Sequence, residues 1–310
     1  MKKLIVVLVV IVLIFVSIYF INQSPVNKTY QIDTTQDQDI TTDTTKRTGE
    51  QPVAVTKEPE PDNGGQLVIG KSVEGRDITA YTYGRGGTEL LFIGGIHGGY
   101  EWNTVIIAYQ LMDYLQANSK VIPDKMKVTV IPVLNPDGLN KTISTTSRFT
   151  AADVPTSQDK QVAGRFNANN VDLNRNFDCD WQAEGKWQNK TVSGGSQAFS
   201  EPESQALRNY VETNKPTAVI TWYSAAGGVF ASSCHNGVSP ETEKITKVYA
   251  TASGYPAHES FNFYEITGDM VNWLAKNNIP AISVLLTNHT DIEWTKNQAG
   301  VDALLKYYGK

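Results

Sequence analysis

Residues 89–104 read ELLFIGGIHGGYEWNT. The apolar run Glu89–Gly94 predicts a β-strand, and the longer segment Trp102–Leu115 predicts a helix. A strand that passes through a glycine-rich turn into a helix is the repeating unit of an α/β fold. His97 and Glu101 lie on that turn, at the carboxyl end of the strand, which is where open α/β sheets place their ligand sites.

The same alternation continues on both sides of this segment. Further strands are expected at Thr79–Tyr83, Lys127–Leu134, Ala218–Trp222 and Ile282–Leu286. Further helices are expected from a capping box at Ser200-Glu201-Pro202-Glu203 to Tyr210, at Pro240–Ala252 behind Ser239, and from about Glu293 to Tyr308. The pattern predicts a single α/β domain with a mixed, mostly parallel sheet sandwiched by helices.

The N-terminal residues 1–21 have the composition of a membrane anchor. Lys2 and Lys3 precede an unbroken membrane-compatible run at residues 4–21, which as a helix would span about 27 Å, close to the thickness of a bilayer's hydrocarbon core. A cleaved signal peptide is the alternative, but its apolar region is usually shorter and ends in a small-x-small site. We expect a single-pass anchor with a cytoplasmic N-terminus and an extracytoplasmic domain, with secretion as the alternative.

The rest of the chain divides into a tether and a domain. Residues 22–62 are polar and Thr/Gln/Asp-rich without apolar periodicity, so we expect a disordered tether. Residues 63–310 are enough for one large core. The net charge of −5 argues against binding to nucleic acid. For Cys179 and Cys234 we favour a disulfide over two separate buried thiols, because the domain is expected to lie outside the membrane, in an oxidising compartment.

Two further segments carry the functional signal. Residues 134–138 read LNPDG at the end of an expected strand, and residues 165–177 read RFNANNVDLNRNF. Together with His97 and Glu101, these segments resemble the zinc metallocarboxypeptidase family, in the compact form found in bacteria. The resemblance extends from about Ile69 to Tyr308 and implies the family's fold, its zinc ion and its reaction, the hydrolytic release of C-terminal residues from peptides.

The resemblance implies a role for each matching residue on the metal side of the site. His97 and Glu101 would be zinc ligands, a combination of imidazole and carboxylate that zinc accepts. Asp172 would orient His97, because a ligating imidazole usually donates its other N–H to a carboxylate.

The matching residues on the substrate side are polar or aromatic. Asn174 and Arg175 would hold the free C-terminal carboxylate, which a planar guanidinium can bind with two hydrogen bonds. Arg165 would polarise the scissile carbonyl. Tyr264, in the segment Phe263–Asp269, would correspond to the mobile tyrosine that closes over the substrate.

Two positions depart from the family pattern. Tyr223 stands 126 residues after His97, where the family has its third zinc ligand, and a phenol with a pKa near 10 is a poor ligand at neutral pH. Leu285 stands where the family has its general-base glutamate, and losing a positioned base typically costs about 10²–10⁴ in rate. His97 and Glu101 are also one residue farther apart than usual, so Tyr100 takes the glutamate's ordinary place. We interpret this spacing as a loop insertion.

Three other residues could compensate for these losses: His235, His289 and Glu265. Each is expected to be a solvent-exposed loop residue, and His235 is the best candidate for a replacement ligand because it follows Tyr223 by only 12 positions.

Two hypotheses therefore remain. The first is a pseudopeptidase that binds peptide C-termini through Asn174, Arg175 and Arg165 without cleaving them. The second is a hydrolase with a rearranged site, using Tyr223 or His235 on the metal. The first is favoured because both losses affect the chemical step. Peptides and peptidoglycan stem peptides are equally compatible with either hypothesis, and nothing in the sequence indicates an oligomeric state.

Overall fold

The computed structural model describes residues 65–310. The anchor expected at residues 1–21, its membrane contact at residues 4–21 and the tether expected at residues 22–62 lie outside the described residues. Among residues 65–310, no helix is both long enough and apolar enough to cross a bilayer.

The described part of the chain alternates between strands and helices, as the sequence predicts. Its strands are β1 (Gln66–Lys71), β2 (Asp77–Gly84), β3 (Thr88–Ile93), β4 (Met126–Ile131), β5 (Glu184–Trp187), β6 (Lys190–Ser193), β7 (Ala218–Ser224), β8 (Gly228–Ala231), β9 (Ala257–His258) and β10 (Ala281–Leu286). Its α-helices are α2 (Trp102–Ala117), α3 (Pro136–Ile143), α4 (Gln158–Ala163), α5 (Pro202–Asn214), α6 (Pro240–Ser253), α7 (Met270–Lys276) and α8 (Trp294–Tyr308). Short 3₁₀ turns are η1 (Gly98–Glu101), η2 (Ser119–Val121), η3 (Ala151–Asp153) and η4 (Leu173–Arg175).

Eight of these strands form one mixed sheet in the order β1-β2-β4-β3-β7-β10-β8-β9. The central strands β4, β3, β7 and β10 are parallel to one another, and the antiparallel pairs lie toward the two edges. A small separate hairpin pairs β5 with β6. Because β3, β7 and β10 run in the same direction, the loops that leave their carboxyl ends emerge at one edge of the sheet.

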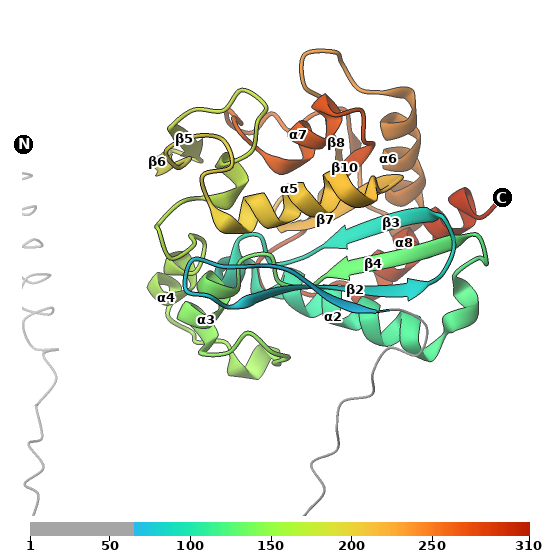
Figure 1. Ribbon diagram of the computed structural model, residues 1–310, viewed down its shortest axis with the longest axis horizontal. Helices are drawn as coiled ribbons and strands as arrows, with labels where there is room; N and C mark the ends of the chain where they lie inside the picture. Colours follow the sequence, from blue (N-terminus) through green and yellow to red (C-terminus); the bar gives the residue numbers. More distant parts are fainter. Residues whose placement is uncertain (1–64) are drawn as a thin grey trace, which may run out of the picture. The chain divides into compact units, whose positions relative to one another are not determined.

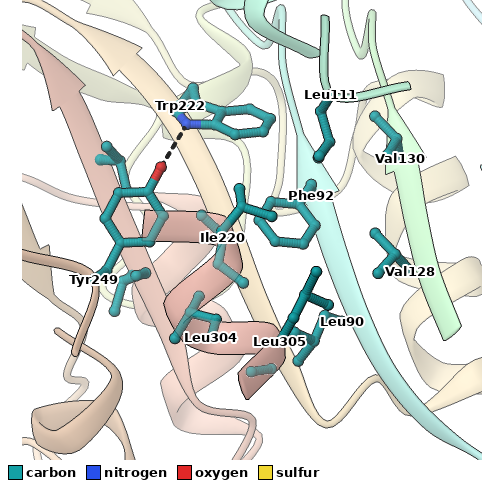
Figure 2. Close-up of a cluster of buried hydrophobic side chains, with 14 of the residues drawn as sticks. Leu90, Phe92, Leu111, Val128, Val130, Ile220, Trp222, Tyr249, Leu304 and Leu305 are labelled. Atoms are coloured by element: carbon teal, nitrogen blue, oxygen red, sulfur yellow. Dashed lines mark hydrogen bonds between the residues drawn. The ribbon is translucent and has the colours of Figure 1, made fainter. Parts of the chain in front are cut away.

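Helices cover both faces of the sheet (Figure 1). One apolar layer includes Phe92 and Trp222 from the sheet, Leu111 from α2 and Leu304 from α8. Figure 2 shows this layer, where the Trp222 indole points toward the Tyr249 hydroxyl of α6. The opposite layer packs residues of α5 and α7 against the other face of the same strands. The expected single α/β domain with a helix-covered sheet is confirmed.

Three local expectations are corrected or decided. The capping box at Ser200 is wrong, because α5 begins one residue later, behind Glu201, and no side chain caps it. The strand expected to reach Leu134 ends at Ile131, since Pro132 has no N–H to donate to the sheet. Cys179 and Cys234 form a disulfide.

Candidate functional site

A cleft of about 830 Å³ lies at the carboxyl ends of β3, β7 and β10. It brings together nearly all the residues singled out from the sequence. The predicted residues that line it are His97, Glu101, Arg165, Asn174, Arg175, Tyr223, Tyr264 and Leu285. Asp172 is fully buried behind them.

The His97 imidazole lies between two carboxylates. Its Nδ1 is 2.9 Å from Glu101 Oε1, and its Nε2 is 3.3 Å from Asp172 Oδ1. The turn that places it requires Gly98, which has a φ of +44° and whose added Cβ would meet the Gly164 carbonyl oxygen at 2.6 Å. The predicted proximity of His97 and Glu101 is thus explained by a tight turn that the glycines permit.

Arg165 completes this group of charges. Its Nε and Nη2 donate to Asp172 Oδ2 at 3.0 and 2.8 Å, and its Nη1 lies 3.9 Å from Glu101 Oε1. Burial raises the pKa of the Asp172 carboxyl, but the charge of Arg165 and the contact with His97 outweigh it, so this pKa lies well below its ordinary value. The guanidinium fork of Arg165 is therefore already engaged by a carboxylate of the protein.

Arg175 is buried differently, because its partners are neutral. Its guanidinium donates from Nε and Nη2 to the Lys186 carbonyl and from Nη1 to the Asn174 carbonyl. Only 1% of Arg175 is exposed, and no carboxylate of residues 65–310 pairs with it within 4.0 Å. The side-chain oxygen of Asn174 accepts from the Tyr223 hydroxyl at 3.3 Å and the Met270 N–H at 3.1 Å. The cleft thus contains a buried cation that forms no salt bridge among the described residues, although its charge acts on the nearby carboxylates of Asp269 and Asp172.

Tyr223 and Leu285, the two positions expected to depart from the family pattern, are direct neighbours. They face each other across the parallel ladder of β7 and β10. Burial, followed by the nearby charges of Asp269 and Glu101, raises the pKa of the Tyr223 phenol well above 10. Its ring centroid lies 5.8 Å from that of His97. The phenol is therefore protonated at neutral pH and is hydrogen-bonded to Asn174.

The zinc carboxypeptidase family model matches residues 54–295. The chain belongs to the zinc carboxypeptidase family. It is similar to the "Gamma-D-glutamyl-L-diamino acid endopeptidase 1" of Lysinibacillus sphaericus, with 26% identity over 221 residues that cover 63% of this chain and 54% of the relative. It is also similar to Metallocarboxypeptidase A of Arthroderma otae, with 27% identity over 235 residues that cover 66% of this chain and 53% of the relative. This carboxypeptidase-family chain spans about half the length of these curated relatives.

Solved structures share the fold at lower sequence identity. The murein-tripeptide amidase from Escherichia coli O157 superimposes with a TM-score of 0.56 at 20% identity, over 78% of this chain and 92% of that one. Carboxypeptidase A from Helicoverpa armigera gives a TM-score of 0.60 at 20% identity, over 80% and 68% of the two chains. These likenesses confirm the carboxypeptidase fold.

Of the three zinc ligands that the family resemblance implies, the described cleft contains two, His97 and Glu101. Both His97 nitrogens lie close to carboxylate oxygens but make no well-aligned hydrogen bond, and Glu101 Oε2 is also buried without one, so these atoms could face a cation. A catalytic zinc normally has three protein ligands. Across residues 65–310, the one cluster of three His, Cys, Asp or Glu donors close enough for a metal is Cys179, Asp180 and Cys234, whose sulfurs are in the disulfide. The residues present therefore do not fit a complete three-ligand zinc site.

The structure favours His289 over His235 as the residue that could compensate, contrary to the expectation from the sequence. His235 does not line the cleft; its side chain is 68% exposed, and its Nε2 lies 3.0 Å from Asp180 Oδ1. His289, expected to be exposed, is half-buried in the cleft with its ring 4.5 Å from that of Tyr100, and its Nδ1 is buried without a partner. Burial lowers the pKa of His289. Its loop follows β10 and returns to the site, which only the tertiary packing reveals.

Glu265 is exposed, as expected, and lies at the cleft wall beside Tyr264. Asp269, at the end of the same segment, is a cleft residue that the sequence reasoning did not single out. Asp269 is the N-cap of α7, a role that an aspartate before a helix commonly has, so its residue type did not indicate that it also lines the cleft.

Proposed function

We propose that this chain binds the C-termini of peptides and hydrolyses them slowly or not at all. Arg175 is the observation that carries the proposal. Burying a guanidinium that forms no salt bridge is unfavourable, so a ligand anion that pairs with it gains the interaction. A peptide carboxylate has the planar two-oxygen geometry that a guanidinium binds best.

The proposed lack of hydrolysis follows from Tyr223 and Leu285. One is a protonated phenol where a metal ligand is needed, and the other is an alkyl side chain where a proton acceptor is needed. Arg165, which would polarise the scissile carbonyl, is held by Asp172. Each of these features weakens the chemical step and leaves carboxylate binding through Asn174 and Arg175 in place.

Peptidoglycan stem peptides are the substrate class that we favour. Two similar proteins bear names that refer to wall peptides, an endopeptidase of γ-D-glutamyl-diamino acid bonds and a murein-tripeptide amidase. The proposal includes an anchor at residues 4–21 that holds the domain outside the membrane, because wall peptides are found there. The apolar run behind two lysines supports this location.

The test uses the purified full chain after equilibration with zinc. Bound zinc is measured by elemental analysis, release of C-terminal residues is measured on a mixed peptide library, and calorimetry compares peptide acids with the matching C-terminal amides. We expect less than one zinc per chain, little release, and binding of the acids only. Robust zinc-dependent turnover by the unmodified chain would contradict the proposal.

A hydrolase with a rearranged site is the second candidate, and His289 is the observation that favours it. A half-buried imidazole with an unpartnered nitrogen in the cleft could accept a proton that Leu285 cannot. If the chain does turn over peptides, His289→Ala should abolish that activity. His235→Ala is the matched control and should have no effect, since His235 is exposed, pairs with Asp180 and does not line the cleft.

A further inference from the structure

The β5–β6 hairpin forms a wall of the cleft and contacts both of its buried arginines. Exposed and buried residues alternate along β5, so Gly185 and Trp187 share the buried face while the Lys186 side chain is exposed. Strand β6 attaches the hairpin to the segment between the arginines, because the Asp172 N–H donates to the Ser193 carbonyl at 2.9 Å. The position of β5 relative to both guanidinium groups is therefore fixed by the backbone.

The backbone of β5 determines which donors of Arg175 are left for a ligand. Gly185 packs against the stem of this side chain, and an added Cβ would meet Arg175 Cδ at 2.7 Å. The Lys186 carbonyl accepts from Nε and Nη2, and the Asn174 carbonyl accepts from Nη1. A guanidinium has five N–H groups, so one N–H remains on each terminal nitrogen. Two such N–H groups suit the two oxygens of a carboxylate.

The Trp187 side chain orients Arg165. The guanidinium lies over its ring, with Cζ 4.5 Å from the ring centroid, and only 6% of the tryptophan is exposed. Asp172 accepts from Nε and Nη2 of the same guanidinium, whereas Nη1 makes no hydrogen bond within residues 65–310. Cation–π stacking fixes the plane of the group and the bonds to Asp172 fix its rotation in that plane. Nη1 is thus held in place as a donor at the cleft.

We infer that the β5 tripeptide Gly185–Trp187 positions both arginines: Arg175 for a terminal carboxylate and Arg165 for the peptide carbonyl before it. The inference rests on the proposed function, because it takes both guanidinium groups as ligand-binding groups. The period of a strand explains how one tripeptide serves both, since alternate positions face the same side. The glycine leaves room for one arginine stem, and the tryptophan supports the plane of the other guanidinium. Groups that are already oriented lose less freedom when a ligand binds, and this increases affinity.

The test uses two probes that share a carboxylate and a side chain and differ in the peptide bond: N-acetyl-glycyl-phenylalanine and 3-phenylpropionate. Their affinities for the full chain are measured by calorimetry. Trp187→Leu keeps an apolar side chain without a π-system, so it should weaken peptide binding about 2- to 30-fold and leave 3-phenylpropionate binding unchanged. Trp187→Phe keeps a π face and should retain most of the peptide affinity. Gly185→Ala displaces Arg175 and should weaken both probes about 10-fold or more.

Glu184→Gln is the matched control. This glutamate lies on the same strand, is exposed and does not line the cleft, so both affinities should equal those of the parent. A Trp187→Leu variant that weakens both probes alike, or neither, would overturn the inference alone, and so would unchanged binding by Gly185→Ala. Equal affinity of the parent for N-acetyl-glycyl-phenylalanine and for its C-terminal amide would overturn the proposed function, and the inference with it.

Discussion

Replacing Arg175 with methionine should separate the affinity of this protein from its stability. Methionine keeps a flexible, unbranched side chain in the space beside Gly185, whose Cα leaves room for the arginine stem, and it removes the guanidinium. The change deletes three charge-assisted hydrogen bonds to two backbone carbonyls, worth about 1.5–3 kcal/mol each. It also removes a buried charge that forms no salt bridge among the described residues, a relief of several kcal/mol. The two effects offset each other, so the free energy of unfolding should stay within about 2 kcal/mol of the parent.

Peptide binding should respond much more strongly. Removing one partner of a buried, hydrogen-bonded charge pair costs about 2–5 kcal/mol, which is a loss of about 30- to 4,000-fold in affinity. Calorimetry with a peptide acid gives the affinity, and urea unfolding gives the stability. Arg148→Met is the control, because Arg148 pairs with Asp113 away from the cleft and its loss should leave binding unchanged.

Two results would refute this reasoning. Unchanged affinity of Arg175→Met for peptide acids would show that the guanidinium is not the carboxylate site. A loss of stability of more than about 4 kcal/mol would show that the buried charge is a structural support, satisfied by its carbonyl partners alone.

Three further predictions follow from the same structure. The double variant Tyr223→His with Leu285→Glu should raise both bound zinc and the release of C-terminal residues; no gain in zinc would mean that the ligand position is misassigned. Because burial raises the pKa of Asp269 to about 6, its ionisation disfavours folding, so the parent should lose stability as pH rises from 4 to 6. This loss amounts to about 3 kcal/mol of the free energy of unfolding, and urea titrations of Asp269→Asn at several pH values should not show it. If the variant loses stability with pH just as the parent does, Asp269 is not the source of the loss. Replacing Cys179 and Cys234 by serine opens a loop of 55-residue separation and should lower the unfolding free energy by about 4 kcal/mol; an unchanged urea midpoint would argue against a stabilising role.

Much of the fold was predictable because its signals are local. The apolar runs of β3, β7 and β10 and the segments of α2, α6 and α8 each appear in the sequence at nearly their observed bounds. The end of β4 was misjudged by three residues, because Pro132–Leu134 are apolar yet leave the sheet. The N-cap of α5 was misjudged because Ser200 instead hydrogen-bonds Glu201 Oε1.

The candidate site was predictable only where a motif specified it. His97, Asp172 and Arg175 were found from short segments, and the cleft brings these segments together. His289 and Asp269 belong to no such motif. Their importance depends on unpaired atoms in a buried cavity, and this is a property of packing that residue identity does not express.

The sequence by itself determined the α/β class and the family resemblance, and it led to the prediction that Tyr223 and Leu285 replace a ligand and a base, because these depend on residue type and on spacing along the chain. Only the tertiary structure decided which residues face one another. It placed Tyr223 opposite Leu285 across one ladder, placed His289 rather than His235 in the cleft, and left Arg175 and Asp269 without a salt bridge among the described residues. The physical reason is that the free energy of a charge depends on its burial and its neighbours, which are set by contacts between segments far apart in the chain.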